Sequence, residues 1–210
     1  MNRLIHYGLG GICAILLACL MVSCHNTKQK TPEQIKEDYH KYLITPDLAL
    51  CELMGNVSTV EYPEGFLQQY VPDLPARADT VSFMPDGMST FAISIGSDTL
   101  LSVRGTGGEV IGFEGGQSSG YKQESHYQDD RNVDHWTWRN AAGDSLVIRF
   151  QKEGRQVSSF TVEGHKRLAG GTIKDIQTDD IGNWISRTVI VRFADGTKHT
   201  QHQRRIITYY

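Results

Sequence analysis

The sequence predicts a mainly β protein, an antiparallel sheet of hairpins in a meander, with a short helical lead before it. Three observations predict this class. From residue 57 onward, short runs rich in Val, Ile, Thr, Phe, Tyr and Trp alternate with polar residues, and Gly, Asp and Asn separate the runs. The same region has no helical repeat of apolar residues. Helix-capping signals stand just before it.

The first 24 residues have the three-part plan of a secretory signal. Arg3 lies in a short basic start, an apolar stretch covers Leu9 to Val22, and the small residue Ser23 precedes Cys24. A membrane span needs about 18 unbroken apolar residues, whereas this stretch is shorter and a polar run follows it at once. We therefore predict that residues 1–23 are a signal peptide that is removed.

The residues Met21-Val22-Ser23-Cys24 resemble a lipobox, in which a bacterial cysteine receives lipid such as palmitate and becomes the new N-terminus. A rival box ends at Cys19, but cleavage there would leave three apolar residues in the mature tail. The sequence thus predicts lipidation of Cys24, with Cys19 as the alternative lipid site and an ordinary, lipid-free signal as the other. Residues 24–31 would be the lipidated tether.

The lipid would anchor the protein in the cell envelope, at the outer membrane. Positions 25–29 carry no acidic residue, and we expect the protein to face the periplasm, with surface exposure as the alternative. Cys13 and Cys19 leave with the signal and Cys24 carries lipid, so Cys51 would be the remaining thiol. The fold then depends on its core, and Cys51, among leucines, is expected to be a buried apolar residue.

A capping box predicts a helix over residues 32–44, at the start of a single domain of residues 32–210. Thr31 is the N-cap, Pro32 the first helical residue, and Gln34 stands three residues after the cap. Apolar residues then recur at helical spacing. A second cap, Thr45 with Pro46, predicts a short helical turn through Leu53, and Gly55 suits a left-handed C-terminal position.

Strand signals fill the rest of the chain. Turn residues such as Pro85-Asp86-Gly87 and Asp195-Gly196 separate them. Asp98, Asp144 and Asp195 each stand where a strand returns, which fits either a repeat or ordinary hairpins. The predicted strands are residues 57–62, 80–84, 89–95, 98–104, 109–113, 121–127, 135–139, 145–151, 156–162, 172–177, 184–193 and 198–209.

Two stretches carry a family resemblance. The first, near the end, contains Asp179, Asp180, Gly182, Asn183, Trp184, Arg187, Asp195-Gly196 and residues 204–210. The second is Leu53-Met54-Gly55-Asn56-Val57-Ser58-Thr59-Val60. Together they resemble a family of uncharacterised lipoproteins of gut anaerobes with a C-terminal GNW hairpin, similar to YD (RHS-like) repeats. The resemblance implies a β-rich fold and carries over no catalytic residue.

The residues of this motif are expected to have structural roles. Gly182-Asn183 can take the positive φ angles of a tight turn, and Trp184 can bury a large face at the start of the next strand. Arg187 is expected to cover or pair at the strand's edge.

One stretch of the sequence has the pattern of a hydrolase motif. Gly116-Gln117-Ser118-Ser119-Gly120 matches the nucleophile elbow G-x-S-x-G, with Asp129 and His165 as candidate triad partners for Ser118. The elbow requires a helix after the serine, and an alternating polar run follows instead. The competing interpretation is a surface loop, which the absence of βαβ units favours.

The densest group of possible metal ligands or acid/base residues comprises His126, Asp129, Asp130, Asp134 and His135. A metal site would need further ligands from elsewhere, so we expect a solvated loop between two strands, with no metal and no cofactor. Trp136 and Trp138, two apart on a strand, share a face. They could stack on carbohydrate or peptide, but core packing is favoured.

The function expected from the sequence is a membrane-anchored, non-catalytic binding or scaffolding module. The alternatives are a serine hydrolase using Ser118 and a carbohydrate-binding accessory protein using Trp136 and Trp138. Charge is nearly balanced, with 21 Lys and Arg against 24 Asp and Glu, which argues against a nucleic-acid partner. The expected partners are the membrane, through lipid on Cys24, and an unidentified envelope protein or glycan.

Overall fold

The computed structural model describes residues 31–34, 37, 43–72, 74, 76–95, 97–115, 122–128, 132–140, 142–164 and 167–210. The chain divides into two compact units, residues 1–37 and 38–210. The predicted signal peptide, Cys19, Cys24 and most of the tether lie outside the described residues.

In the first unit, residues 32–34 and 37 are helical. The predicted capping box is confirmed, since the Thr31 N–H donates to Gln34 Oε1 at 3.0 Å and the Gln34 N–H donates to Thr31 Oγ1 at 3.2 Å. The predicted helical end is wrong, because residues 43–45 are not helical.

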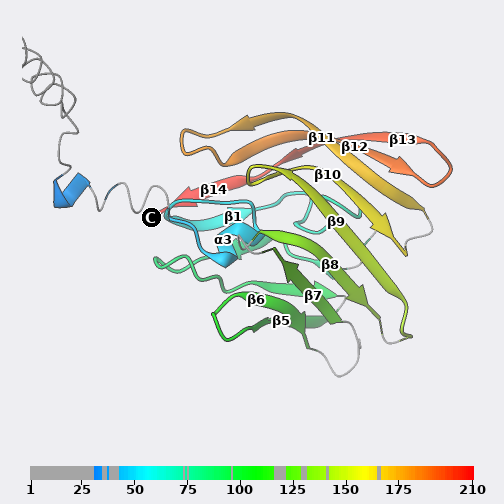
Figure 1. Cartoon of the computed structure of the whole chain (residues 1–210), viewed down its shortest axis with the longest axis horizontal. Helices are drawn as coiled ribbons and strands as arrows, with labels where there is room; N and C mark the ends of the chain where they lie inside the picture. Colours follow the sequence, from blue (N-terminus) through cyan, green and yellow to red (C-terminus); the bar gives the residue numbers. More distant parts are fainter. Residues whose placement is uncertain are drawn as a thin grey trace, which may run out of the picture. The chain divides into compact units, whose positions relative to one another are not determined.

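Residues 43–210 are mainly β, as predicted (Figure 1). Strands β4 to β13 form a meander in which each strand pairs antiparallel with the next, and β2 adds to β4 at the edge. A small sheet has the order β14-β1-β3. The strands are β1 (Val57–Glu61), β2 (Ala76–Arg77), β3 (Thr80–Ser82), β4 (Ala92–Ile95), β5 (Asp98–Arg104), β6 (Val110–Glu114), β7 (Lys122–Tyr127), β8 (Val133–Arg139), β9 (Ser145–Glu153), β10 (Gln156–Glu163), β11 (Leu168–Thr178), β12 (Trp184–Phe193), β13 (Lys198–Arg204) and β14 (Ile206–Tyr209).

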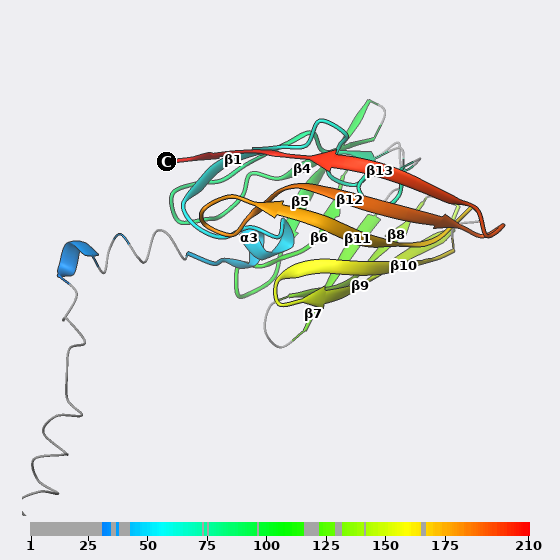
Figure 2. The same cartoon turned by 90° about the horizontal axis from the view of Figure 1, so that it is seen from above.

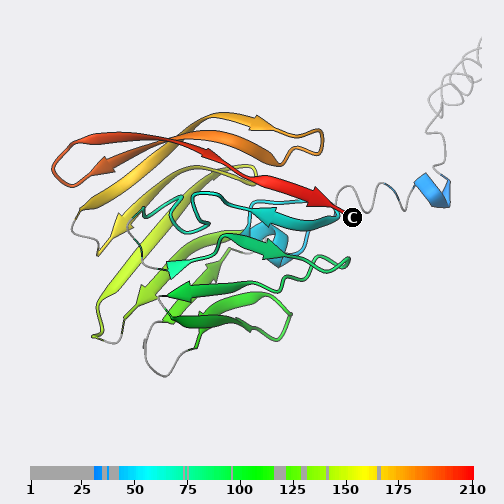
Figure 3. The same cartoon turned by 180° about the vertical axis from the view of Figure 1, so that it is seen from behind.

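The predicted strand 198–209 is two strands, which is a correction. The chain breaks at Arg205, whose side chain turns into the core, so β13 stays in the large sheet and β14 joins the small one. Figures 1 and 3 show β14 beside β1. Because Val57 pairs with Tyr209, the small sheet joins the first strand of the chain's β region to its last strand.

The core lies between the inner face of the large sheet and the segment of residues 43–91. In Figures 2 and 3, α3 (Pro46–Leu50) and the small sheet lie against this face. Phe66 meets Trp136 with ring centroids 5.6 Å apart, and Tyr70 meets Phe150 at 5.0 Å. Alternation along the strands therefore places one face in the core and leaves the outer face exposed.

Helix α3 begins with the predicted cap, since Thr45 Oγ1 accepts the Leu48 N–H at 3.2 Å. Its acidic residue Asp47 is buried and accepts two bonds from the Arg104 guanidinium, at 3.0 and 2.7 Å. An acid in the first helical turn is favoured by the helix dipole, and here it also ties α3 to β5.

The helix ends at Leu50, earlier than predicted, in a Schellman motif. The Leu53 N–H donates to the Leu48 carbonyl at 2.8 Å, and the Glu52 N–H donates to that of Ala49 at 3.1 Å. Glu52 holds the left-handed position, with φ of +54°, where a glycine is usual. Gly55 is left-handed as well, at +89°, but lies beyond the motif. A non-glycine residue here indicates that contacts of its side chain offset the strain.

Candidate functional site

Trp136 and Trp138 belong to the core. Each is 3 % exposed, and Trp136 packs against Phe150 with centroids 4.8 Å apart. The preference for core packing is confirmed. A stacking platform needs an exposed ring face, so the alternative carbohydrate site built on these two residues is wrong.

His126 and His135 are brought together, as directly opposed residues of β7 and β8. Their rings stack with centroids 4.1 Å apart, and His135 Nδ1 lies 2.7 Å from Asp134 Oδ2. Asp129 and Asp130 lie outside the described residues. Within the part of the chain that the structure describes, no three His, Cys, Asp or Glu side chains gather as metal ligands.

The hydrolase residues Ser118, Asp129 and His165 also lie outside the described residues. Cys51 is described, and it is buried as predicted. Burial raises the pKa of its thiol to about 12, because desolvation disfavours the thiolate.

We expect Cys51 to resist thiol reagents in the folded protein. At pH 8 the raised pKa and burial leave almost no accessible thiolate, which is the reactive form. Labelling with a chromogenic disulfide reagent should give the same thiol count for the full chain and its Cys51→Ala variant. In guanidinium the full chain should gain one thiol over the variant. Equal labelling of Cys51 before and after unfolding would contradict the prediction.

The GNW motif makes a closed turn that holds three distant segments together. Asp179 Oδ1 accepts the N–H groups of residues 181, 182 and 183 at 2.9 to 3.0 Å. The Asn183 amide accepts from the Met54 N–H and donates to the Met54 carbonyl, both at 2.8 Å, as a strand partner would. It also donates to the Tyr209 hydroxyl at 2.7 Å. In this turn Gly182 has a positive φ, of +98°, and Asn183 does not, so the expectation for Asn183 is wrong.

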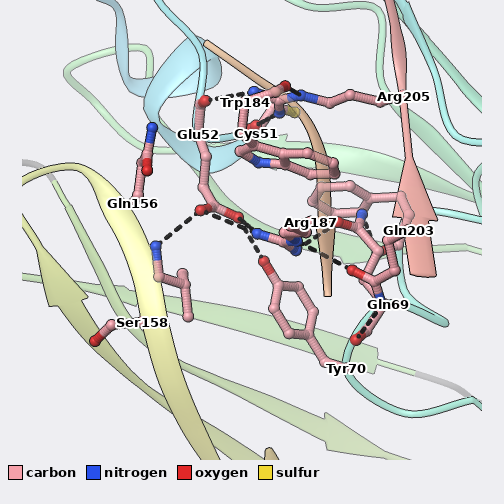
Figure 4. A network of polar contacts seen from close by, with 12 residues as sticks. Cys51, Glu52, Gln69, Tyr70, Gln156, Ser158, Trp184, Arg187, Gln203 and Arg205 are labelled. Atoms are coloured by element: carbon pink, nitrogen blue, oxygen red, sulfur yellow. Dashed lines mark hydrogen bonds and ion pairs between the residues drawn. The ribbon is translucent and has the colours of Figure 1, made fainter. Parts of the chain in front are cut away.

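Arg187 is buried, not at a strand edge as expected. Its Nη1 lies 3.1 Å from Glu52 Oε1 (Figure 4), and both side chains are almost completely buried. Gln69 and Gln203 accept its other N–H groups at 2.7 and 3.0 Å. Glu52 also accepts from the Tyr70 hydroxyl and the Val157 N–H, each at 2.8 Å. The charges of Glu52 and Arg187 are thus both paired.

The pKa of Glu52 reflects opposing causes. Burial alone would raise it, whereas the Arg187 charge and the hydrogen bond from the Val157 N–H lower it, and the net pKa lies below the ordinary value. The carboxylate is therefore ionised at neutral pH. These contacts explain how Glu52 is held in its left-handed conformation.

Trp184 lies between two guanidinium groups (Figure 4). The central carbons of Arg187 and Arg205 are each 4.0 Å from the ring centroid. Arg205 donates to the carbonyls of Cys51 at 2.7 Å and Glu52 at 3.0 Å, which satisfies the C-terminal end of α3. The four side chains of this cluster, Glu52, Arg187, Trp184 and Arg205, are each at most 8 % exposed, and their contacts with one another give the cluster a structural role.

The candidate site is a shallow hollow on the exposed face of β10 to β13, of about 390 Å³. Its charged lining consists of Lys174, Arg192 and Lys198, and no acidic residue lines it. All three side chains are exposed, and none makes a salt bridge or side-chain hydrogen bond within the described residues. Gly170, directly opposite Thr161 and Arg192, keeps the floor low, and hydroxyls of neighbouring Ser and Thr residues line the sides.

The strand register extends the hollow into a row across the sheet. Directly opposed residues of seven strands make the row, which comprises Lys198, Arg192, Gly170, Thr161, Arg149, His135 and His126. Adjacent strands lie 4.7–4.9 Å apart, so the row is roughly 29 Å long. Glu163 pairs with Arg149 at 3.3 Å and Asp134 with His135, so the uncompensated positive charge is in the hollow.

Sequence reasoning found only the histidine end of this row. Lys174, Arg149, Arg192 and Lys198 occur on four different strands, and nothing in their spacing marks them as a group. The hairpin turns bring them onto one face. A register prediction for β8 to β13, anchored on the turns at 142–144, 154 and 195–196, was the signal that could have found them.

The chain matches none of the protein-family models with which it was compared, and none of the curated proteins. The site is therefore interpreted from its own geometry.

Proposed function

We propose that this protein is a membrane-anchored, non-catalytic binding or scaffolding lipoprotein of the bacterial envelope. Lipid on Cys24, or alternatively Cys19, would hold it at the outer membrane, facing the periplasm. The N-terminal sequence pattern supports the anchor. Among the described residues, no helix is both long and apolar enough to span a membrane.

The observation that carries the binding role is the hollow on β10 to β13. Its three cations are exposed and unpaired within the described part of the chain, although the whole chain has a net charge of -3. Like charges gathered without counter-ions destabilise a surface slightly, so their presence together favours a role in recognition. The buried ion pair of Glu52 and Arg187 supplies a rigid support for the same sheet.

The test is affinity capture of the anchored protein from its native envelope. We expect a partner to be recovered with the full chain, but not with a Cys24→Ser variant, which should also lose incorporated palmitate. Arg192→Gln/Lys198→Gln should reduce recovery, while Arg139→Gln, an exposed cation outside the hollow, should not. Equal recovery with all variants would refute the proposed binding face.

A further inference from the structure

We propose that the hollow and the row bind a linear acidic polysaccharide, laid across the strands with its carboxylates on Lys174, Arg192 and Lys198. This inference rests on the proposed binding function and names its ligand class. Three features of the exposed face carry it: the local charge, the direction of the row and the groups between the cations.

Charge defines the sign of the ligand. The hollow contains three cations and no acid, and Arg192 faces Lys198 directly across the β12–β13 pair. Two cations on opposed strand positions repel each other unless an anion lies between them. Arg and Lys donors form their strongest hydrogen bonds with anionic oxygens. An anionic group seated at this pair would relieve the repulsion.

Direction defines the shape of the ligand. The row runs perpendicular to the strands, from β13 to β7, so an extended chain that follows it crosses strand after strand. A peptide that adds to a sheet edge would instead run parallel to β13, and would turn away from Arg149 and the histidine pair. A flat membrane surface would meet protruding side chains and leave the low floor at Gly170 without contact.

The remaining groups define the chemistry. Thr161 and Thr172 place hydroxyls beside the cations, and each can both donate to and accept from a sugar hydroxyl, while the Ser159 hydroxyl donates to Gln151 and can accept from one. The aromatic residue of the hollow, Phe160, is 2 % exposed and has no open ring face. Single-stranded nucleic acids are bound largely through stacking on such faces, so a polysaccharide fits this surface better.

The test measures binding of the full-length protein in detergent to polygalacturonate, a uronic-acid polymer. Removal of Arg192 and Lys198 charges, as Arg192→Gln/Lys198→Gln, should weaken binding by at least about tenfold, because each lost contact is a charge-assisted hydrogen bond. Arg139 lies on the same face of β8 as His135 but outside the row, so Arg139→Gln should leave binding unchanged. Raised salt should weaken binding through screening.

A second variant tests the row. Arg149→Gln should weaken binding of the long polymer and leave binding of a short galacturonate oligomer unchanged, because the oligomer fills only the hollow. Equal thermal midpoints of the variants, whose side chains are exposed, would show that their folds are intact.

Several outcomes would overturn the inference. They are no binding of polygalacturonate, equal binding by the double variant, equal binding of neutral dextran, and equal or tighter binding of poly-glutamate or of phosphatidylglycerol vesicles. If envelope capture still recovers a partner through Arg192 and Lys198, the binding function stands and only the ligand class fails. If capture also fails, both proposals fail.

Discussion

Replacing Glu52 with Gln should lower the free energy of unfolding by about 3–5 kcal/mol, the usual cost of removing one partner from a buried ion pair. The substitution keeps the size of the side chain and removes its charge. Arg187 would then remain buried beside a neutral amide, 3.1 Å from the former carboxylate oxygen. Urea unfolding followed by circular dichroism would measure the loss.

Glu163→Gln is the matched control, since it breaks an exposed pair with Arg149 at 3.3 Å. Exposed pairs contribute about 0–1 kcal/mol, so this variant should be nearly as stable as the parent. A loss of similar size in both variants would contradict the assignment of Glu52 to a buried pair.

The difference in free energy of unfolding between the parent and Glu52→Gln should also depend on pH, which gives a second test of the prediction. The folded pKa of Glu52 lies below the ordinary value of 4.5, so its contribution to stability is present above that value. It is lost as the pH falls through the lowered folded pKa, because protonation then removes the charge in the parent too. The gap between parent and Glu52→Gln should thus be full at pH 7 and shrink in acid.

Trp184→Ala should lower the free energy of unfolding by about 3–5 kcal/mol, the usual cost for a buried tryptophan. The ring is 1 % exposed and separates two guanidinium groups, each 4.0 Å from its centroid. Without the ring, a cavity forms and two like charges face each other across it. Urea unfolding would again measure the change.

Trp184→Phe serves as the companion variant, because a smaller aromatic ring keeps part of both cation–π contacts. Its loss should be clearly smaller than that of Trp184→Ala. Equal losses in the two variants would contradict the prediction, because the Phe ring should both fill part of the cavity and keep part of the cation–π contacts.

Local signals in the sequence were sufficient for most of the fold. The bounds of β5 and β12 agree with the prediction to the residue, because alternation and flanking turns are short-range features. The caps at Thr31 and Thr45 follow for the same reason. Asp179, Gly182 and Asn183 stood out in the sequence, and their hydrogen bonds form the closed turn.

Long-range pairing could not be predicted from the sequence. Glu52 and Arg187 lie 135 positions apart, and Asn183 and Met54 lie 129 apart. Nothing local shows that a glutamate occupies a left-handed position, or that the strand 198–209 breaks at Arg205 to reach the helix end. The cationic hollow was missed likewise, since it exists only once four strands are in register.

The pairing of β1 with β14 has a consequence for biogenesis. The two strands are about 150 residues apart, so β1 cannot pair with β14 until the C-terminal residues have been synthesised. Non-local pairing of this kind slows folding. Until then β1 can pair only with β3, which leaves one of its hydrogen-bonding edges open. A chain halted before residue 206 would thus carry an edge strand with unpaired backbone N–H and C=O groups, which favours aggregation. Synthesis of the C-terminal residues is therefore the step that protects the newly made protein from aggregation.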